Sequence, residues 1–473
     1  MICKGCFAAV KNSGRCPYCG YVDGEPGKDG ESFAPGTVLE GRYLLGNVIH
    51  STESSITYQG YDRLLDQFVS LRQKREFLDT GTFFQKAKWI SNFKNQKNVI
   101  NIYDCQKLSD RWFMILQNIG KSTEKVQISE AVHSSLITVG KGDVVTDSKG
   151  DFLIIDFEIS APYETVSWDH QGSDASLLLG EDSNHFLKKN TILQDRYRIV
   201  EPLGKGGFGV TYLALDQRLD RLVAIKEYMP SEWVFRDPEE ECVEVVSSAV
   251  LEQFQKGLEN FLREAVYIAR LNGNKYTADI YDYFMENETA YIVMEYIEGE
   301  NIGRFGKLIG GYPYEAAKEI FINLLDALQD IHEKGIIHQD ISPGNILFNK
   351  KNQLKIIDFG SAHVSGSRIT SVAEMMIKPG YAAPEQYDED YRSSVKTDIY
   401  QAAATFYTLI TGKKPVDASR RWKEDTLLMP SELGIQIPRQ EEEVLRQALE
   451  ILPEKRIATI SDLKKSFQHR QGQ

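Results

Sequence analysis

The order of hydrophobic and polar residues predicts both helices and strands in this chain. In residues 250–271, apolar side chains recur every three or four positions, the period of one helix face. Residues 315–335 show the same period and predict a second, buried helix. Shorter apolar runs at 197–203 and 291–299 predict strands. The apolar face of the first helix, which we expect to pack into a core, is Leu251, Phe254, Leu258, Phe261, Leu262, Ala265 and Ile268.

Two stretches lack any such period. Residues 23–35 are rich in Gly, Pro and charged residues, and residues 161–188 collect Ser, Asp and Gly. Segments of this composition bury too little apolar surface to fold alone. We therefore expect both to be linkers.

The chain contains an internal repeat. Residues 36–72 align without gaps with residues 190–226. The residue types that recur 154 positions later are those of Thr37, Leu39, Arg42, Tyr43, Thr57, Tyr58, Asp62, Leu65, Asp66 and Val69. The similarity continues at 83–87 with 261–265, and at 102–104 with 280–282. Chance does not explain a register kept over this length, so the two stretches are interpreted as copies of one unit.

Composition limits the class of protein. The chain has 473 residues, of which 42% are hydrophobic and 26% charged, which is ordinary for folded domains. This length predicts about three domains. The net charge of −13 argues against a general nucleic-acid or anionic-membrane surface, because both would be repelled. No apolar run has the length of a membrane span, and the N-terminus lacks the apolar core of a signal peptide, so we expect a cytoplasmic protein.

Four of the six cysteines lie near the N-terminus, in two pairs with the spacing of zinc ligands. Cys3 and Cys6 form the first pair, and Cys16 and Cys19 the second. Two such pairs complete a tetrahedral Zn2+ site, whose binding free energy would fold a segment too short to have a core. A redox pair or unconnected thiols is the alternative. A site with four cysteine ligands has no open position, so its expected role is structural.

Residues 338–360 carry the candidate chemistry. Asp340 and Asn345 are followed by an apolar strand that ends at Asp358, Phe359 and Gly360. Asp340 would accept the proton of a hydroxyl group, and Asn345 and Asp358 would supply the oxygen ligands that Mg2+ prefers. The alternative interpretation is a turn with solvated acidic residues and a buried strand. At this spacing, the stretch resembles the catalytic and metal-binding loops of protein kinases.

The resemblance to protein kinases covers residues 189–470 and implies a two-lobed α+β fold that binds ATP and Mg2+. It implies that Lys226 binds the inner phosphates and that Glu264 pairs with Lys226. Glycines would allow a tight hairpin over the phosphates, and residues 291–299 would form the hinge beside the adenine. The nucleotide pocket that the resemblance implies consists of Leu203, Gly204, Gly206, Gly209, Thr211, Ala224, Lys226, Met294, Glu295, Ile297 and Leu347.

Further residues match the architecture of protein kinases rather than their chemistry. Glu385 is expected to be buried against Arg456, and Asp398 to brace the backbone of the catalytic loop. Together with Tyr381, they distinguish protein kinases from small-molecule kinases. Residues 236–245 lie in an expanded segment; its acidic residues are most simply a solvated loop, and docking of another part of the chain remains the alternative.

Four positions depart from the family pattern. One is Thr211, which stands in place of the usual Val over the adenine, a modest loss of apolar contact. Gln339 replaces the usual Arg, which disfavours activation by loop phosphorylation. Ser342 replaces the Lys that reaches the transferred phosphate in Ser/Thr kinases, and Lys378 replaces a Thr. We hypothesise that Lys378 returns the missing cation to the site. Candidate autophosphorylation sites follow from position alone and are Ser361, Ser365, Ser367, Thr370 and Ser371.

The first copy lacks the residues that would bind a nucleotide. His50, Thr52 and Ser55 stand where the second copy has glycines, so the backbone cannot approach phosphates closely. Arg72 replaces Lys226, Lys86 replaces Glu264, and no counterpart of the catalytic loop exists. A remnant of the metal-binding strand pair is expected at 143–160. We interpret residues 36–160 as a degenerate kinase N-lobe that binds no nucleotide; a docking or regulatory role and a structural spacer remain equal alternatives.

The sequence thus predicts a bacterial-type Ser/Thr protein kinase that acts on protein substrates. One rival is a pseudokinase scaffold that binds ATP but transfers phosphate poorly, and another is a small-molecule phosphotransferase. The predicted organisation is a zinc ribbon at 1–22, a linker at 23–35, a degenerate N-lobe-like domain at 36–160, a linker at 161–188 and a kinase domain at 189–470.

Overall fold

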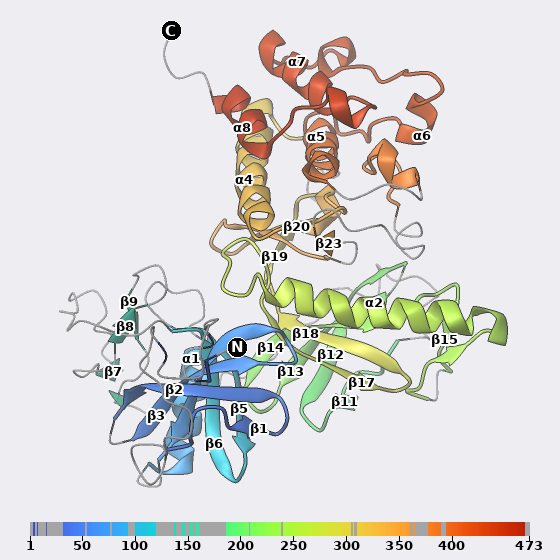
Figure 1. Cartoon of the computed structure of the whole chain (residues 1–473). Helices are drawn as coiled ribbons and strands as arrows, with labels where there is room; N and C mark the ends of the chain where they lie inside the picture. Colours follow the sequence, from blue (N-terminus) through green and yellow to red (C-terminus); the bar gives the residue numbers. More distant parts are fainter. Residues whose placement is uncertain are drawn as a thin grey trace. The chain divides into compact units, whose positions relative to one another are not determined.

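A computed structural model provides the structure of the chain (Figure 1). The residues it describes are 3, 4, 7, 16, 32–52, 54–75, 78–92, 100–119, 137–138, 144–146, 152–154, 158–159, 186–207, 209–237, 240–303, 306, 310–359, 363–364, 377–388 and 394–468. The chain divides into two compact units. The first comprises Met1–Leu178, Leu187–Glu201 and Leu213–Val223, and the second Leu179–Phe186, Pro202–Tyr212 and Ala224–Gln473.

The first copy of the repeat folds into a six-stranded antiparallel sheet with one helix. Its strands are β1 (Val38–Leu39), β2 (Tyr43–Ser51), β3 (Ser55–Asp62), β4 (Gln67–Lys74), β5 (Ile102–Leu108) and β6 (Arg111–Gln117), in the order β1-β2-β3-β4-β6-β5. Helix α1 (Thr80–Asn92) connects β4 to β5. The turn between β3 and β4 is held by Asp62, which accepts hydrogen bonds from the backbone of Leu64 and Leu65 and pairs with Arg42.

The second copy forms a sheet with the same strand order. Its strands are β11 (Ile192–Leu193), β12 (Tyr197–Gly206), β13 (Gly209–Asp216), β14 (Arg221–Tyr228), β17 (Ile280–Glu286) and β18 (Thr289–Glu295), in the order β11-β12-β13-β14-β18-β17. Helix α2 (Leu251–Ala269) occupies the place of α1 and follows a 3-10 turn, η4 (Ser248–Val250). The β5–β6 pair shifts register between Ile102 and Asp104, and β17–β18 between Ile280 and Asp282, which are aligned positions of the repeat.

Where the second copy carries Lys226 and Gly209, the first copy has a side-chain hydrogen bond. Arg72 Nε donates to Ser55 Oγ over 2.9 Å, and both residues are buried. The positions of Lys226 and Gly209 are thus taken in the first copy by two side chains that bond to each other.

The remaining strands form small sheets. These are β7 (Ile137–Thr138) with β10 (Glu158–Ile159), β8 (Val144–Thr146) with β9 (Phe152–Ile154), β15 (Val234–Phe235) with β16 (Glu244–Val245), β20 (Ile336–Ile337) with β23 (His363–Val364), and the triple β19 (Gly299–Asn301), β21 (Ile346–Asn349) and β22 (Leu354–Ile356). The first two pairs fall in the expected remnant at 143–160 or beside it, but its Asp156 and Phe157 lie outside the described residues.

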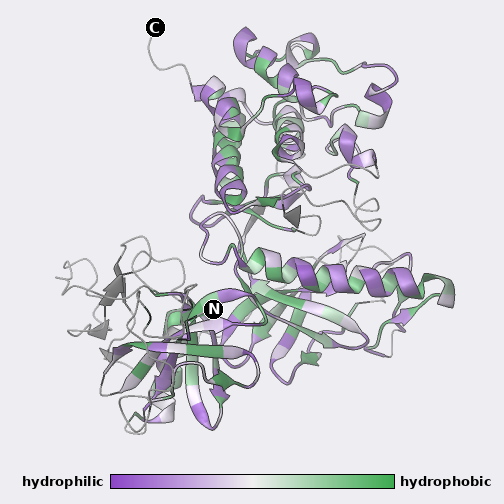
Figure 2. Ribbon diagram, viewed as in Figure 1, coloured by the Kyte–Doolittle hydropathy of each residue, from purple (hydrophilic) through white to green (hydrophobic). Residues whose placement is uncertain are grey.

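Helices build the C-terminal part of the second unit. They are α4 (Tyr314–Glu333), α5 (Val395–Thr411), α6 (Ala418–Arg421), α7 (Arg439–Ala448) and α8 (Ile460–Gln468), with 3-10 turns η5 (Pro343–Asn345), η7 (Pro384–Tyr387), η8 (Pro430–Leu433) and η9 (Pro453–Lys455). Helix α5 is buried almost throughout, whereas α4 alternates hydrophobic and hydrophilic positions (Figure 2). In the core, Phe321 of α4 stacks on Phe406 of α5, and Phe467 of α8 packs against both rings edge to face.

Both helices that hydrophobic period predicts are present, as α2 and α4. The expected apolar face of α2 is buried at Phe254, Phe261, Ala265 and Ile268, but Leu251 is 41% exposed because it opens the first turn. No helix among the described residues is both long and apolar enough to cross a bilayer.

The N-terminal cysteines are described only in part. Cys3 and Cys16, one from each pair, are buried, whereas Cys6 and Cys19 lie outside the described residues. Within the described part of the chain, no three His, Cys, Asp or Glu residues gather in a way that could hold a metal ion.

Candidate active site

The loop from His338 to Ser342 is held in place by the first turn of α5. Asp398 accepts hydrogen bonds from the backbone N–H of His338, over 2.9 Å, and of Gln339, over 2.7 Å. Burial alone would raise the pKa of Asp398, but the hydrogen bond and charge of His332 and the hydrogen bond from His338 lower it below its ordinary value. The predicted bracing role of Asp398 is confirmed. The loop needs this support because Gln339 has a φ of 62°, which is costly for a non-glycine residue.

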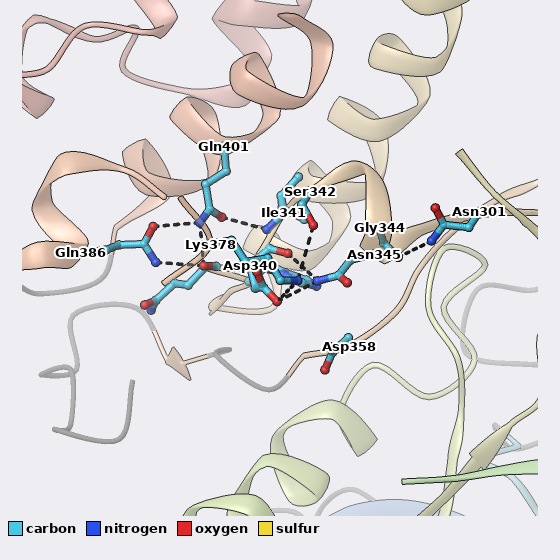
Figure 3. Close-up of polar contacts among 12 residues, drawn as sticks. Asn301, Asp340, Ile341, Ser342, Gly344, Asn345, Asp358, Lys378, Gln386 and Gln401 are labelled. Carbon is cyan, nitrogen blue, oxygen red and sulfur yellow. Dashed lines mark hydrogen bonds and ion pairs between the residues drawn. The ribbon is translucent and has the colours of Figure 1, made fainter. Parts of the chain in front are cut away.

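Two glutamine side chains add to this support, as Figure 3 shows. Gln401 accepts a hydrogen bond from Ile341 N over 2.9 Å and donates to Gln339 O over 2.7 Å. Gln386 donates to the same carbonyl over 2.9 Å. The sequence analysis missed both residues. The only signal for Gln401 was its spacing from Asp398, three positions along one helix face.

Asp340 lies at the centre of a polar cluster in this loop. Asn345 Nδ2 donates to Asp340 Oδ2 and to Asp340 O, each over 2.8 Å. Lys378 Nζ donates to Asp340 Oδ2 over 2.7 Å and to Ser342 Oγ over 3.5 Å (Figure 3). Burial raises the pKa of Asp340 to about 7, although Lys378 and Asn345 act in the opposite direction. The arrangement holds a carboxylate oxygen in a fixed position beside a cation.

Lys226 joins strand β14 to helix α2 and to Asp358, which follows β22. Its Nζ lies 3.3 Å from Glu264 Oε1 and 2.8 Å from Asp358 Oδ1. Burial would lower the pKa of Lys226, but the two carboxylates, Asp358 first, raise it well above its usual range. The ammonium group of Lys226 in turn holds the pKa of Asp358 well below normal. Lys226 is therefore a permanent cation and Asp358 a permanent anion at neutral pH.

The expected nucleotide-binding residues lie on a few neighbouring elements of the second unit. Leu203, Gly204 and Gly206 lie on β12, Gly209 and Thr211 on β13, Ala224 on β14, Met294 and Glu295 at the end of β18, Ile297 just after it, and Leu347 on β21. A side chain at Gly209 is excluded because its Cβ would lie 2.1 Å from Glu227 O. The carboxylate of Glu295 lies 3.3 Å from Asp279 N, from which it accepts a hydrogen bond, and 3.8 Å from Lys355 Nζ.

The segment between β14 and α2 contains a buried ion pair that the sequence analysis missed. Arg236 is 1% exposed, and its guanidinium donates two hydrogen bonds to Glu227, one of them over 3.1 Å. Tyr212 and Tyr291 donate to the same carboxylate over 2.8 and 2.6 Å. The described acidic residues of 236–245 are exposed, as expected for a solvated loop, but Arg236 anchors the segment beside Lys226.

The C-terminal architecture contains the predicted pair of Glu385 and Arg456. Each carboxylate oxygen of Glu385 accepts a hydrogen bond from Arg456 over 2.6 Å, and both side chains are buried. The bidentate geometry satisfies both charges inside the core, so this prediction is confirmed. Tyr381 is also buried, three residues before η7, the turn that contains Glu385.

Comparison with known families decides what kind of site this is. Residues 197–468, more than half of the chain, match the protein kinase domain family. The chain belongs to this family. Its fold, a sheet with helix α2 followed by a helical part, is therefore the two-lobed protein kinase fold.

Several bacterial proteins and one solved structure are similar to the kinase domain. "Probable serine/threonine-protein kinase CPE1738" of Clostridium perfringens is 30% identical over 279 residues, which are 58% of this chain and 38% of that protein. "Serine/threonine-protein kinase D" of Synechocystis is 33% identical over 282 residues, 57% of this chain and 51% of that protein. The solved structure "PpkA-294 apo form" is 27% identical, with a TM-score of 0.52, and covers 60% of this chain and 99% of its own.

The chain thus spans about half the length of these curated relatives, or less. Protein kinases use ATP and Mg2+. The residues present fit both, because Asn345 uses its amide nitrogen for its two bonds to Asp340, which leaves the amide oxygen as a ligand, and Asp358 is ionised.

Proposed function

We propose that the chain is a Ser/Thr protein kinase, which transfers the γ-phosphate of ATP to hydroxyl groups of proteins. The observation that carries this proposal is the cluster of Asp340, Asn345 and Lys378. It lies in the same unit as the Lys226–Glu264–Asp358 ion-pair network. These two clusters supply a base, a cation for phosphates and oxygen ligands for a metal, which are the parts that phosphoryl transfer requires.

Each residue has a separate role in the proposed reaction. Asp340 orients the substrate hydroxyl and accepts its proton, and Lys226, held by Glu264, binds the inner phosphates. Asn345 and Asp358 would hold Mg2+, which neutralises charge on the phosphoryl oxygens when it is bound. Positioning and fixed charges would supply the rate, because the protein forms no covalent bond to the phosphate.

Lys378 is the proposed replacement for the lysine that the family has at Ser342. Its Nζ reaches Asp340 and Ser342 from the segment after the activation loop. A cation there stabilises charge on the transferred phosphate and orients Asp340, whichever side of the loop it comes from. This contact favours an active enzyme over the pseudokinase alternative.

A phosphotransfer assay on wild type and Asp340→Asn tests the proposal. Incubation with ATP, Mg2+ and a generic protein substrate, followed by mass spectrometry, should show phosphorylated Ser or Thr with wild type only. Equal incorporation in both forms would leave only the ATP-binding scaffold. Turnover of a free hydroxyl compound, independent of Tyr381, Glu385 and Arg456, would instead indicate a small-molecule phosphotransferase. Ser361, Ser365, Ser367, Thr370 and Ser371 are candidate autophosphorylation sites, and all lie outside the described residues.

Calorimetry tests the metal ligands separately. ATP should bind wild type more tightly with Mg2+ than without it, and Asp358→Asn should lose this difference because one anionic ligand is removed. Unchanged Mg2+ dependence in the variant would contradict the assignment.

We also propose that residues 36–160 are a degenerate kinase N-lobe that binds no nucleotide. The common strand order and register shift of the two sheets support a shared origin. The Arg72–Ser55 hydrogen bond occupies the position where phosphates would bind. Equilibrium dialysis of Lys226→Met with labelled ATP should find no second nucleotide site; stoichiometric binding to this variant would overturn the proposal.

For residues 1–22 we propose a structural zinc ribbon with the ligands Cys3, Cys6, Cys16 and Cys19. The spacing of the two pairs supports it, and Cys3 and Cys16, one from each pair, are buried. Elemental analysis should find one Zn2+ per chain, which Cys3→Ser with Cys16→Ser should lose. A chain that purifies without zinc after growth in zinc-rich medium would contradict this proposal.

A further inference from the structure

The turn between β13 and β14 of the kinase domain lies in the first unit, in contact with the first sheet. Its Leu219 is fully buried and belongs to a hydrophobic cluster that the first copy otherwise builds. The other members of that cluster come from α1, β5, β6 and the residues next to them: Phe83, Ala87, Ile90, Ile100, Ile102, Cys105, Met114, Leu116 and Ile119. Ser91 Oγ donates to Leu219 O over 3.2 Å, so the backbone of the turn is fixed as well.

Arg221, the first residue of β14, binds the backbone of β5. Its guanidinium donates to Ile102 O over 2.9 Å and to Tyr103 O over 2.7 Å. In the second copy, the carbonyl aligned with Ile102 is that of Ile280, and there it accepts a hydrogen bond from Asn272 over 2.8 Å. The first copy therefore receives from the kinase domain a hydrogen bond that the second copy makes locally.

Charged residues extend the same contact. Arg196 pairs with Asp216 over 2.7 Å within the kinase sheet and with Asp104 of the first sheet over 3.0 Å. The aligned pair in the first copy, Arg42 with Asp62, repeats the internal bond over 2.8 Å. Arg196 is 6% exposed and Asp104 8% in their side chains, so this ion pair is shielded from water and from screening by salt.

In the second copy, the segment between α2 and β17 contacts β22 of the C-terminal part. In the second copy, Thr277 pairs with Ile356 of β22, and Ile356 N donates to Tyr276 O over 2.7 Å. The first copy is followed by no comparable catalytic segment in the sequence. The α1–β5–β6 face of the first copy would otherwise expose apolar side chains.

We propose that residues 36–119 form a docking module whose partner is the β13–β14 turn of the kinase domain in the same chain. Leu219 closes the core of the module, and Arg221 and Arg196 fix the turn on β5. The turn joins β13 and β14, the strands that carry Thr211 and Lys226. This inference selects the docking role over the spacer and does not depend on phosphotransfer.

Hydrogen exchange of the full chain, measured by mass spectrometry, tests the docking. Leu219→Asn removes the side chain that closes the module's core and places a polar group there, so amides of residues 83–90 and 102–116 should exchange roughly tenfold faster or more. The amides of residues 395–411 in α5 should exchange at their wild-type rates. The matched control is Gln217→Ala in the same turn, where the side chain is exposed. Unchanged exchange at 83–116 in Leu219→Asn would overturn the proposal.

A second variant decides the case if Leu219→Asn unfolds the kinase domain too. Asp104→Asn changes only the first sheet, and docking predicts faster exchange in residues 213–221 of the kinase domain because Arg196 loses its ion pair with Asp104 and keeps only the one with Asp216. Exchange at 213–221 within about twofold of wild type would overturn the proposal, because that difference corresponds to less than the free energy of a shielded ion pair.

Discussion

Lys378 is the residue at which this site departs most from the family pattern. It provides a cation 2.7 Å from the carboxylate of Asp340, where relatives of the Ser/Thr class are expected to have a threonine. We predict that Lys378→Ala lowers kcat on the order of 10²-fold. The variant loses two electrostatic contacts at once, one to the transferred phosphate and one to the base Asp340. The measurement is steady-state phosphotransfer with saturating ATP.

Two variants serve as controls for this prediction. Lys378→Arg keeps a positive charge and should retain a larger share of the activity than the alanine variant. Lys413→Ala removes an exposed lysine from the loop after α5 and should leave kcat unchanged. Wild-type turnover in Lys378→Ala would show that the site works without a cation at this position.

At the scale of elements, the ion pair between Arg236 and Glu227 ties the segment before α2 to strand β14. We predict that Arg236→Ala destabilises the kinase domain by about 3–5 kcal/mol, because Glu227 is then left as a buried charge without its cation. Urea unfolding of the full chain, followed by tryptophan fluorescence, measures the change. Glu241→Ala, an exposed residue of the same segment, is the matched control.

A double variant separates the charge effect from the loss of packing. Arg236→Met with Glu227→Gln removes both charges at similar volume and should recover a large part of the lost stability. If the double variant is as unstable as Arg236→Ala, the burial of charge is not the cause.

The elements with a strong hydrophobic period were predictable from sequence. Residues 250–271 and 315–335 were expected as helices, and α2 and α4 span 251–269 and 314–333. The Glu385–Arg456 pair followed from the family pattern, because a buried carboxylate needs a bidentate partner. Arg236 was not predictable in this way, because an isolated arginine among acidic residues looks solvated. Its burial depends on Tyr212 and Tyr291, which only the tertiary fold brings to Glu227.

At the scale of the whole molecule, Asp398 links folding to pH. Its folded pKa is lowered, so its contribution to stability is present above the unfolded pKa of about 3.9 and is lost as pH falls through the lower folded value. We predict that Asp398→Asn is less stable than wild type at pH 7 and that its unfolding free energy depends less on pH below about 5. Chemical denaturation of wild type and variant between pH 3 and pH 7 measures the unfolding free energy of each and how steeply it changes with pH.

Asp237→Asn, which removes an exposed carboxylate, is the control for this series. Its stability should follow that of wild type across the pH range. A pH dependence in Asp398→Asn as steep as in wild type would show that other groups dominate acid unfolding.

The hydrogen bond between Arg72 and Ser55 limits how the first copy can evolve. Exchange of arginine for lysine would leave the serine in place, and exchange of serine for glycine would leave a buried guanidinium without its acceptor. Either single mutation therefore removes the hydrogen bond without creating a phosphate-binding position. A return of the first copy to nucleotide binding would therefore require both substitutions together.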